Sequence, residues 1–116
     1  MIWKIADGFA RPEVQGAFLS FTSHKFKEHL KCHHKEKLKQ YYVDNADRIY
    51  QFWERDSRVK ECWSEKFLLQ KLQYIHNNPC QSHWNLVSEP NDYECSSASF
   101  YHNGKSKYKW LVHYAS

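Results

Sequence analysis

The feature that most constrains this chain is an amphipathic helical stretch that ends at a proline, in residues 69–79. Leu68, Leu72 and Ile75 recur at helical spacing, so they predict a face that packs against a core. Pro79 ends the helix, and its ring disfavours helical geometry at the residue before it. We therefore expect Asn78 to lie just outside regular helix geometry.

A second face of this helix carries side chains that could do chemistry. Phe67, Lys71, Tyr74 and Asn78 fall at i, i+4, i+7 and i+11, so they share one side of the helix. A tyrosine hydroxyl near a cation and a potential metal ligand could act as a nucleophile on a phosphate. The alternative is an ordinary helix with a half-buried Tyr74 and with Asn77 and Asn78 as caps, and spacing alone favours that alternative.

Length and charge are compatible with one basic domain. The 116 residues leave little room for a second domain, and the 41% hydrophobic content predicts a core. The formal charge of +4 allows a polyanionic partner without requiring one. With no apolar run of membrane-spanning length and nothing like a signal peptide, we expect a cytoplasmic protein with reduced cysteines. The adjacent Cys32, His33 and His34 lack the spacing of a structural zinc site.

The first 40 residues predict a strand followed by helices. Met1–Ala6 is a short apolar run that we expect as a buried strand. Pro12 is typical of a helix start, and the apolar phase slips at Thr22–Ser23, which predicts a kink or a new start there. The segment Lys25–Lys39 is basic and rich in histidine. It is either a helix that contacts phosphates or a solvated helix face, and the sequence leaves both open.

The middle of the chain predicts a hairpin before the proline-stopped helix. We expect a loop at Tyr41–Asn45, a strand at Ile49–Trp53, a turn at Glu54–Ser57 and a returning strand at Arg58–Trp63. Ser64 is the expected N-cap of the helix.

The region after Pro79 is expected to be irregular. A loop is predicted at Ser88–Asp92, a short helix over Ala98–Tyr101 capped by Ser96 or Ser97, and a turn at His102–Lys105. Tyr108–Tyr114 could dock as a final strand or as an arm. The five tryptophans are expected in the core rather than as platforms for bases: Trp3, Trp53, Trp63, Trp84 and Trp110.

Several of these motifs together resemble the single-tyrosine HUH transposases. That family comprises transposases of the smallest bacterial insertion sequences and their relatives associated with REP palindromes. The likeness runs from about Met1 to Tyr114 and implies an α+β fold, the C-terminal portion of a ferredoxin-like (split βαβ) domain, mostly helical with a few short strands. The motifs that carry it are Lys71–Pro79, Leu86–Val87, Asp92–Tyr93, Ser96–Ala98 with Tyr101, and Phe52–Asp56.

The resemblance implies a reaction on single-stranded, hairpin-forming DNA. Tyr74 matches the nucleophile, which leaves a 5′-phosphotyrosine and a free 3′-hydroxyl. Asn78 matches a metal ligand, and a His-hydrophobic-His motif supplies the other ligands of a Mg²⁺ or Mn²⁺ ion. A homodimer is possible, and Trp53 or Trp63 could stack on unpaired bases. The basic residues expected to contact DNA phosphates are Lys71, Arg55, Arg58, Lys25, Lys31 and Lys35.

The chain departs from the family at the histidine pair, because no His-x-His occurs in the sequence. We therefore expect residues 1–116 to be a single transposase-like domain that is truncated at its N-terminus. A lone amide oxygen from Asn78 would not hold magnesium against water, so this chain alone is expected to be inactive and metal-free. Three hypotheses follow: an impaired transposase, a non-catalytic DNA-binding remnant, and a structural fragment with no DNA role.

Overall fold

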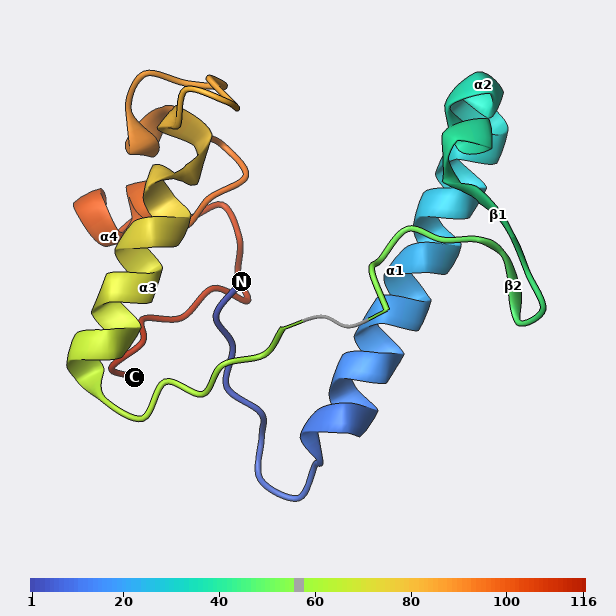
Figure 1. Cartoon of the computed structure of the whole chain (residues 1–116). Coiled ribbons are helices and arrows are strands. Elements are labelled where there is room, and N and C mark those ends of the chain that lie inside the picture. The colour runs from blue at the N-terminus through green and yellow to red at the C-terminus, as the bar shows by residue number, and fades with distance from the viewer. Residues whose placement is uncertain (56–57) are drawn as a thin grey trace. The chain divides into compact units, whose positions relative to one another are not determined.

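The computed structural model describes residues 1–55 and 58–116 and divides the chain into two compact units. Trp3–Lys60 form one unit, and Met1–Ile2 together with Glu61–Ser116 form the other. Of the described residues, 48% are helical and 6% are in strands, so the α+β class with few short strands is confirmed. Figure 1 shows the elements of each unit.

The unit Trp3–Lys60 is built on one long helix, α1 (Arg11–His33). Pro12 lies in the first turn, where the missing N–H of proline leaves no hydrogen bond unmade. Glu13 in the first turn and Lys31 and His33 in the last turn complement the helix dipole. The sequence therefore sets both ends of α1 locally.

The new helix start expected as one alternative at Thr22–Ser23 is wrong, because α1 runs through these residues without interruption, and the other alternative, a kink, stays a prediction. The Thr22 hydroxyl donates to the Phe18 carbonyl oxygen at 2.8 Å and accepts the indole N–H of Trp53 at 2.9 Å. No residue of α1 is buried, so no single stripe has to stay on a core face. The slip in the apolar phase therefore does not interrupt the helix.

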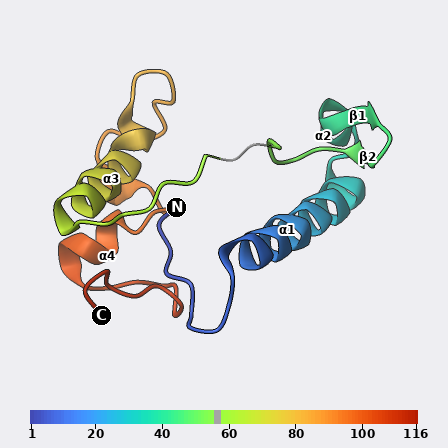
Figure 2. The same ribbon diagram turned by 60° about the horizontal axis from the view of Figure 1, so that its bottom comes forward.

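A small hairpin follows α1 in the same unit. Tyr42 lies opposite Tyr50 with the rings 6.1 Å apart, and the register shifts before Asn45 pairs with Arg48. The loop expected at Tyr41–Asn45 is therefore wrong, since cross-strand aromatic pairs stabilise a strand there. Figure 2 shows the hairpin beside the short second helix. The elements are α2 (Lys35–Leu38), the 3₁₀ helix η1 (Lys39–Tyr41), β1 (Tyr42–Asn45) and β2 (Arg48–Tyr50).

An aromatic cluster links α1 to the segment after β2. The Trp53 ring lies 6.4 Å from Phe18 and 5.9 Å from Phe26. Phe52 lies 6.0 Å from Phe26 and stacks on Tyr41 at 4.8 Å. Such pairs add a specific attraction to the burial of apolar area, so this cluster takes the place of a larger core in the unit.

Two expected strands are absent from the parts of the chain that the structure describes, and a third segment takes the alternative form that was expected for it, an arm. Met1–Ala6 and Arg58–Trp63 are irregular, Tyr108–Tyr114 is an arm with turns, and β2 ends at Tyr50 rather than at Trp53. The only sheet in residues 1–55 and 58–116 is the β1–β2 pair. An apolar run becomes a strand only if a neighbouring strand satisfies its backbone groups. Asp56 and Ser57 of the expected turn lie outside the described residues.

The unit with Glu61–Ser116 is organised around α3 (Glu65–Asn77). Ser64 caps it as expected, because its side-chain oxygen accepts the Phe67 N–H at 3.2 Å. Gly104 has φ of +72°, which suits glycine after a helix end. The loop expected at Ser88–Asp92 contains a short 3₁₀ helix. The further elements are η2 (Asn78–Cys80), η3 (Pro90–Asp92) and α4 (Ala98–Asn103).

The C-terminal segment docks as an arm through two tyrosines. The Tyr114 N–H donates to the Tyr101 hydroxyl at 3.1 Å, and the Tyr114 hydroxyl donates to Glu65 at 3.0 Å. This hydrogen bond raises the pKa of Tyr114. The arm therefore ties the start of α3 to α4.

The expectation that the tryptophans lie in the core is wrong. All five are exposed, with Trp63 at 83% and Trp53 at 37%. Leu38, Pro79 and Ala98 are the only buried residues in the described part of the chain. The aromatic rings pack in pairs and small clusters on the surface, such as Trp53 with Phe18 and Phe26, instead of filling a common interior. The four cysteines are free thiols, as the sequence indicates.

We predict that Ser64→Ala lowers the free energy of unfolding by about 1 kcal/mol, because the mutation removes the N-cap of α3. Urea denaturation followed by far-ultraviolet circular dichroism measures this loss. Ser88→Ala is the matched control, since Ser88 lies in an exposed loop. Equal stability of the two variants would contradict the capping role.

Candidate functional site

The face of α3 predicted from spacing exists in the structure. The Lys71 Nζ lies 5.2 Å from the centre of the Phe67 ring and 5.9 Å from the centre of the Tyr74 ring. Lys71 thus sits between two aromatic rings one helical turn on either side of it, at cation–π distance from both. This arrangement holds an ammonium group close to the phenol.

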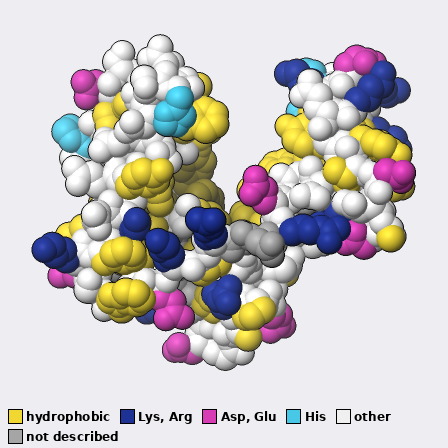
Figure 3. All heavy atoms as spheres, in the orientation of Figure 1, with side chains coloured by type: hydrophobic (Ala, Val, Ile, Leu, Met, Phe, Trp, Pro, Cys, Tyr) yellow, Lys and Arg dark blue, Asp and Glu magenta, His cyan; other side chains and the backbone are white. Residues whose placement is uncertain are grey.

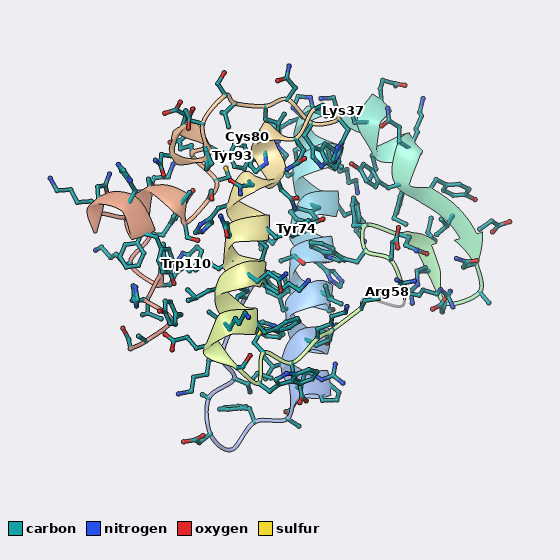
Figure 4. The ribbon with its side chains drawn as sticks, turned by 60° about the vertical axis from the view of Figure 1, so that its left-hand side comes forward. Lys37, Arg58, Tyr74, Cys80, Tyr93 and Trp110 are labelled. Carbon is teal, nitrogen blue, oxygen red and sulfur yellow. The ribbon has the colours of Figure 1, made fainter. Side chains whose placement is uncertain are left out.

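Tyr74 is open to solvent, with 63% of its surface exposed. The half-buried tyrosine of the alternative interpretation is therefore wrong. Figure 4 shows Tyr74 on the flank of α3 away from α4 and Trp110. A phenol in this position can meet a large ligand without rearrangement of α3.

The backbone at Asn78 differs from the expectation. Asn78 has φ −52° and ψ −46°, which is helical geometry, and its N–H is bonded to the carbonyl oxygens of Tyr74 and Ile75. The helical hydrogen bonding carries Asn78 into η2 despite the proline after it, and Pro79 itself is buried. The Pro79 carbonyl oxygen accepts the Leu86 N–H at 2.9 Å, which secures the following loop. Asn78 therefore keeps the helical register with Tyr74.

The residues around Tyr74 do not fit a magnesium site. Mg²⁺ prefers oxygen ligands and commonly takes carboxylates together with water. Asn78 offers one neutral amide, and the nearby His76 has its Nε2 hydrogen-bonded to Ser97. Among residues 1–55 and 58–116, no group of three or more His, Cys, Asp or Glu side chains could hold an ion together.

The opposite face of α3 packs toward α4, as Figures 1 and 2 show. His76 Nε2 lies 2.8 Å from the Ser97 hydroxyl oxygen, and the His76 ring lies 5.5 Å from that of Tyr101. Burial lowers the pKa of His76 below its ordinary value of 6.5. An open hollow lies along this face, and among its lining residues are Leu72, His76, Pro90, Ala98 and Tyr101.

The other predicted DNA-contacting residues belong to the unit Trp3–Lys60. Lys25 pairs with Glu28 at 3.1 Å, whereas Lys31 and Lys35 are exposed on α1 and α2. Figure 3 shows basic, histidine and acidic side chains together near α2.

The two predicted arginines differ in their surroundings. Arg55 is bonded to Asp47 at 2.9 Å. Arg48 also donates to Asp47, and this bond is the main cause of the lowered pKa of the Asp47 carboxyl. Arg58 is exposed. The Asp47 carboxylate therefore partly neutralises the charge of Arg55, and Arg58 is the more available of the two arginines for binding a phosphate.

Sequence reasoning did not identify two contacts that position Tyr74. The His76–Ser97 hydrogen bond and the Glu65–Tyr114 hydrogen bond orient α3 within its unit. The sequence did carry a signal for His76, because this residue lies four positions after Leu72 and so on the side of the helix that was predicted to face the core. Nothing in the local sequence indicated its partner, because Ser97 is 21 residues away.

Comparisons with protein-family models, curated proteins and solved structures find no match to this chain. None of the helices in residues 1–55 and 58–116 is long and apolar enough to cross a bilayer.

We predict that folding becomes less favourable as the pH falls below about 6.5, in part through His76. The folded-state pKa of His76 is lowered, so the unfolded chain binds a proton there in a pH range where the folded chain does not. Urea unfolding at about pH 7.5 and about pH 5.5 should show a smaller pH effect for His76→Gln than for the wild type. His83→Gln, at an exposed histidine, is the control and should leave the pH effect unchanged. An unchanged pH effect in His76→Gln would contradict this assignment.

Proposed function

We propose that this chain binds single-stranded, hairpin-forming DNA in the manner of the single-tyrosine HUH transposases, with Tyr74 presented as the nucleophile. The observation that carries the proposal is the exposed phenol of Tyr74, with the Lys71 ammonium group 5.9 Å from its ring. A ferredoxin-like domain, a homodimer and a cytoplasmic location are part of the same proposal, since they come from the family resemblance.

Lys71 has a definite role in this proposal. An ammonium group attracts a DNA phosphate and stabilises the negative charge that develops on it during attack. Phe67 holds the Lys71 side chain on the other side through its ring face, 5.2 Å away. A scissile phosphate bound by Lys71 would thus lie next to the Tyr74 hydroxyl.

The covalent step would follow the family reaction. The Tyr74 phenol loses its proton, its oxygen forms a bond to phosphorus, and the bond between phosphorus and the 3′ oxygen breaks. The departing 3′ oxygen takes a proton, which leaves a 5′-phosphotyrosine and a free 3′-hydroxyl. Since the sequence has no His-x-His and Asn78 alone does not make a magnesium site, we expect this chain by itself to bind DNA without cutting it.

Basic residues outside α3 would add electrostatic affinity. Lys31 and Lys35 are exposed, and Arg58 is exposed in the segment before α3. Phosphate contacts of this kind carry no sequence information, but they fix the register of a protein on its nucleic acid. The net charge of +4 is consistent with such a partner.

A non-catalytic nucleic-acid-binding role is the second candidate. The absence of His-x-His favours it over an active transposase. Both candidates require salt-dependent DNA binding, whereas a structural fragment with no DNA role does not. Since this chain alone is expected not to cut DNA, the two candidates are separated by a covalent adduct on Tyr74 that forms when a segment with a His-hydrophobic-His motif is supplied.

We predict that the chain binds a single-stranded DNA hairpin with an affinity that falls steeply as salt rises. Lys71→Gln should reduce the slope of log affinity against log salt by about 0.7, the share of one phosphate contact on a single strand. Gel shifts over a salt series measure this slope. Lys66→Gln removes the same charge from another face of α3 and should not change it. Binding that is absent, or independent of salt, would rule out both DNA-binding candidates.

We predict that the wild-type chain forms no covalent adduct with a labelled DNA hairpin in Mg²⁺ or Mn²⁺. Denaturing gel electrophoresis detects such an adduct. An adduct that Tyr74→Phe abolishes, and that Tyr42→Phe at another exposed tyrosine preserves, would show that this chain is itself a nuclease. The non-catalytic candidate would then be wrong.

A further inference from the structure

The last turns of α1 bring histidine rings together. His29 and His33 are one helical turn apart, and their rings stack with centres 4.6 Å apart at an angle of 21°. The His34 ring lies 6.0 Å from that of His29. All three side chains are exposed. The signal in the sequence is the spacing of four residues between His29 and His33, which places both on one side of a helix.

A hydrogen bond sets the tautomer of one ring. His33 Nδ1 lies 3.0 Å from the His29 carbonyl oxygen, and a carbonyl can only accept, so Nδ1 carries the proton. The other nitrogen, Nε2, then keeps a lone pair that a metal ion can use. A backbone carbonyl on the second nitrogen is also the usual way in which proteins orient a ligating histidine.

The charges around the three histidines partly favour and partly oppose a bound metal cation. His33 is the last residue of α1, and the negative end of the helix dipole favours positive charge there. Of the neighbouring lysines, Lys25 and Lys39 are paired with Glu28 and Glu36. The remaining ones oppose a bound cation, so we expect a modest affinity. These are Lys27, Lys31, Lys35 and Lys37.

We propose that His29 and His33 form a two-imidazole chelate for a divalent transition-metal ion such as Zn²⁺, Ni²⁺ or Cu²⁺, with water completing the coordination. Imidazole nitrogen suits these ions, whereas Mg²⁺ and Mn²⁺ prefer oxygen ligands. Two histidines one turn apart are also the pair that binds zinc on the helix of many metalloproteases. A two-ligand site is compatible with the lack of any group of three metal-binding side chains in the described chain. It is independent of Tyr74 and of the proposed DNA binding.

Calorimetric titration of the full chain with NiCl₂ tests the site, with MgCl₂ as the comparison ion. We expect saturable binding of one Ni²⁺ and no binding of Mg²⁺. His33→Ala and His33→Gln should each weaken Ni²⁺ binding by about tenfold or more, because loss of one ligand removes the intramolecular advantage of the chelate. Circular dichroism of each variant checks that α1 remains helical.

His24→Ala is the matched control. His24 lies on the same helix, also bonds a carbonyl oxygen through Nδ1, and has no histidine one turn away. It should leave the Ni²⁺ affinity unchanged. Equal affinities of His33→Ala and His24→Ala would overturn the proposal. Loss of binding in Cys32→Ser, with His33→Ala unaffected, would overturn it too, because the ion would then sit on the thiol.

Discussion

The hydrogen bond between His76 and Ser97 decides how α3 is oriented. The His76 Nε2 lies 2.8 Å from the Ser97 hydroxyl oxygen, so this side of α3 faces the start of α4. Because of the helical period, Tyr74, two residues earlier, then points away from α4. The second bond, from Tyr114 to Glu65, fixes the other end of the helix. With both ends held, the phenol of Tyr74 faces solvent as a consequence of contacts made behind it.

Of the residues that share the Tyr74 side of α3, Tyr74 is exposed while Phe67, Lys71 and Asn78 are partly buried. Lys71 lies between Phe67 and Tyr74, so one side chain both packs on two rings and keeps its charge available. The cation is then held where a phosphate bound at Tyr74 would need it. The same face offers only the Asn78 amide as a metal ligand. The proposed function therefore includes DNA binding, for which Lys71 supplies a positive charge, but not DNA cleavage by this chain alone, which would need a bound metal ion.

The fold was predictable where the determinants are local. The N-cap at Ser64, the α3 face and the short α4 helix came from periodicity and capping residues. The strands were predicted poorly. Met1–Ala6 has the apolar composition of a strand, yet no neighbour in the described chain pairs with it. The new helix start expected at Thr22–Ser23 failed because α1 buries no residue, so a slip in its apolar phase disturbs no core face.

The sequence by itself determined that Phe67, Lys71 and Tyr74 share one side of a helix, because the helical period follows from the backbone alone. Only the tertiary structure decided that Tyr74 is the exposed residue of the three and that the other side of α3 packs against α4. The partners of His76, Tyr101 and Glu65 lie 21, 13 and 49 residues away in the chain. Contacts between such distant residues depend on how the whole unit packs, and no local pattern specifies them.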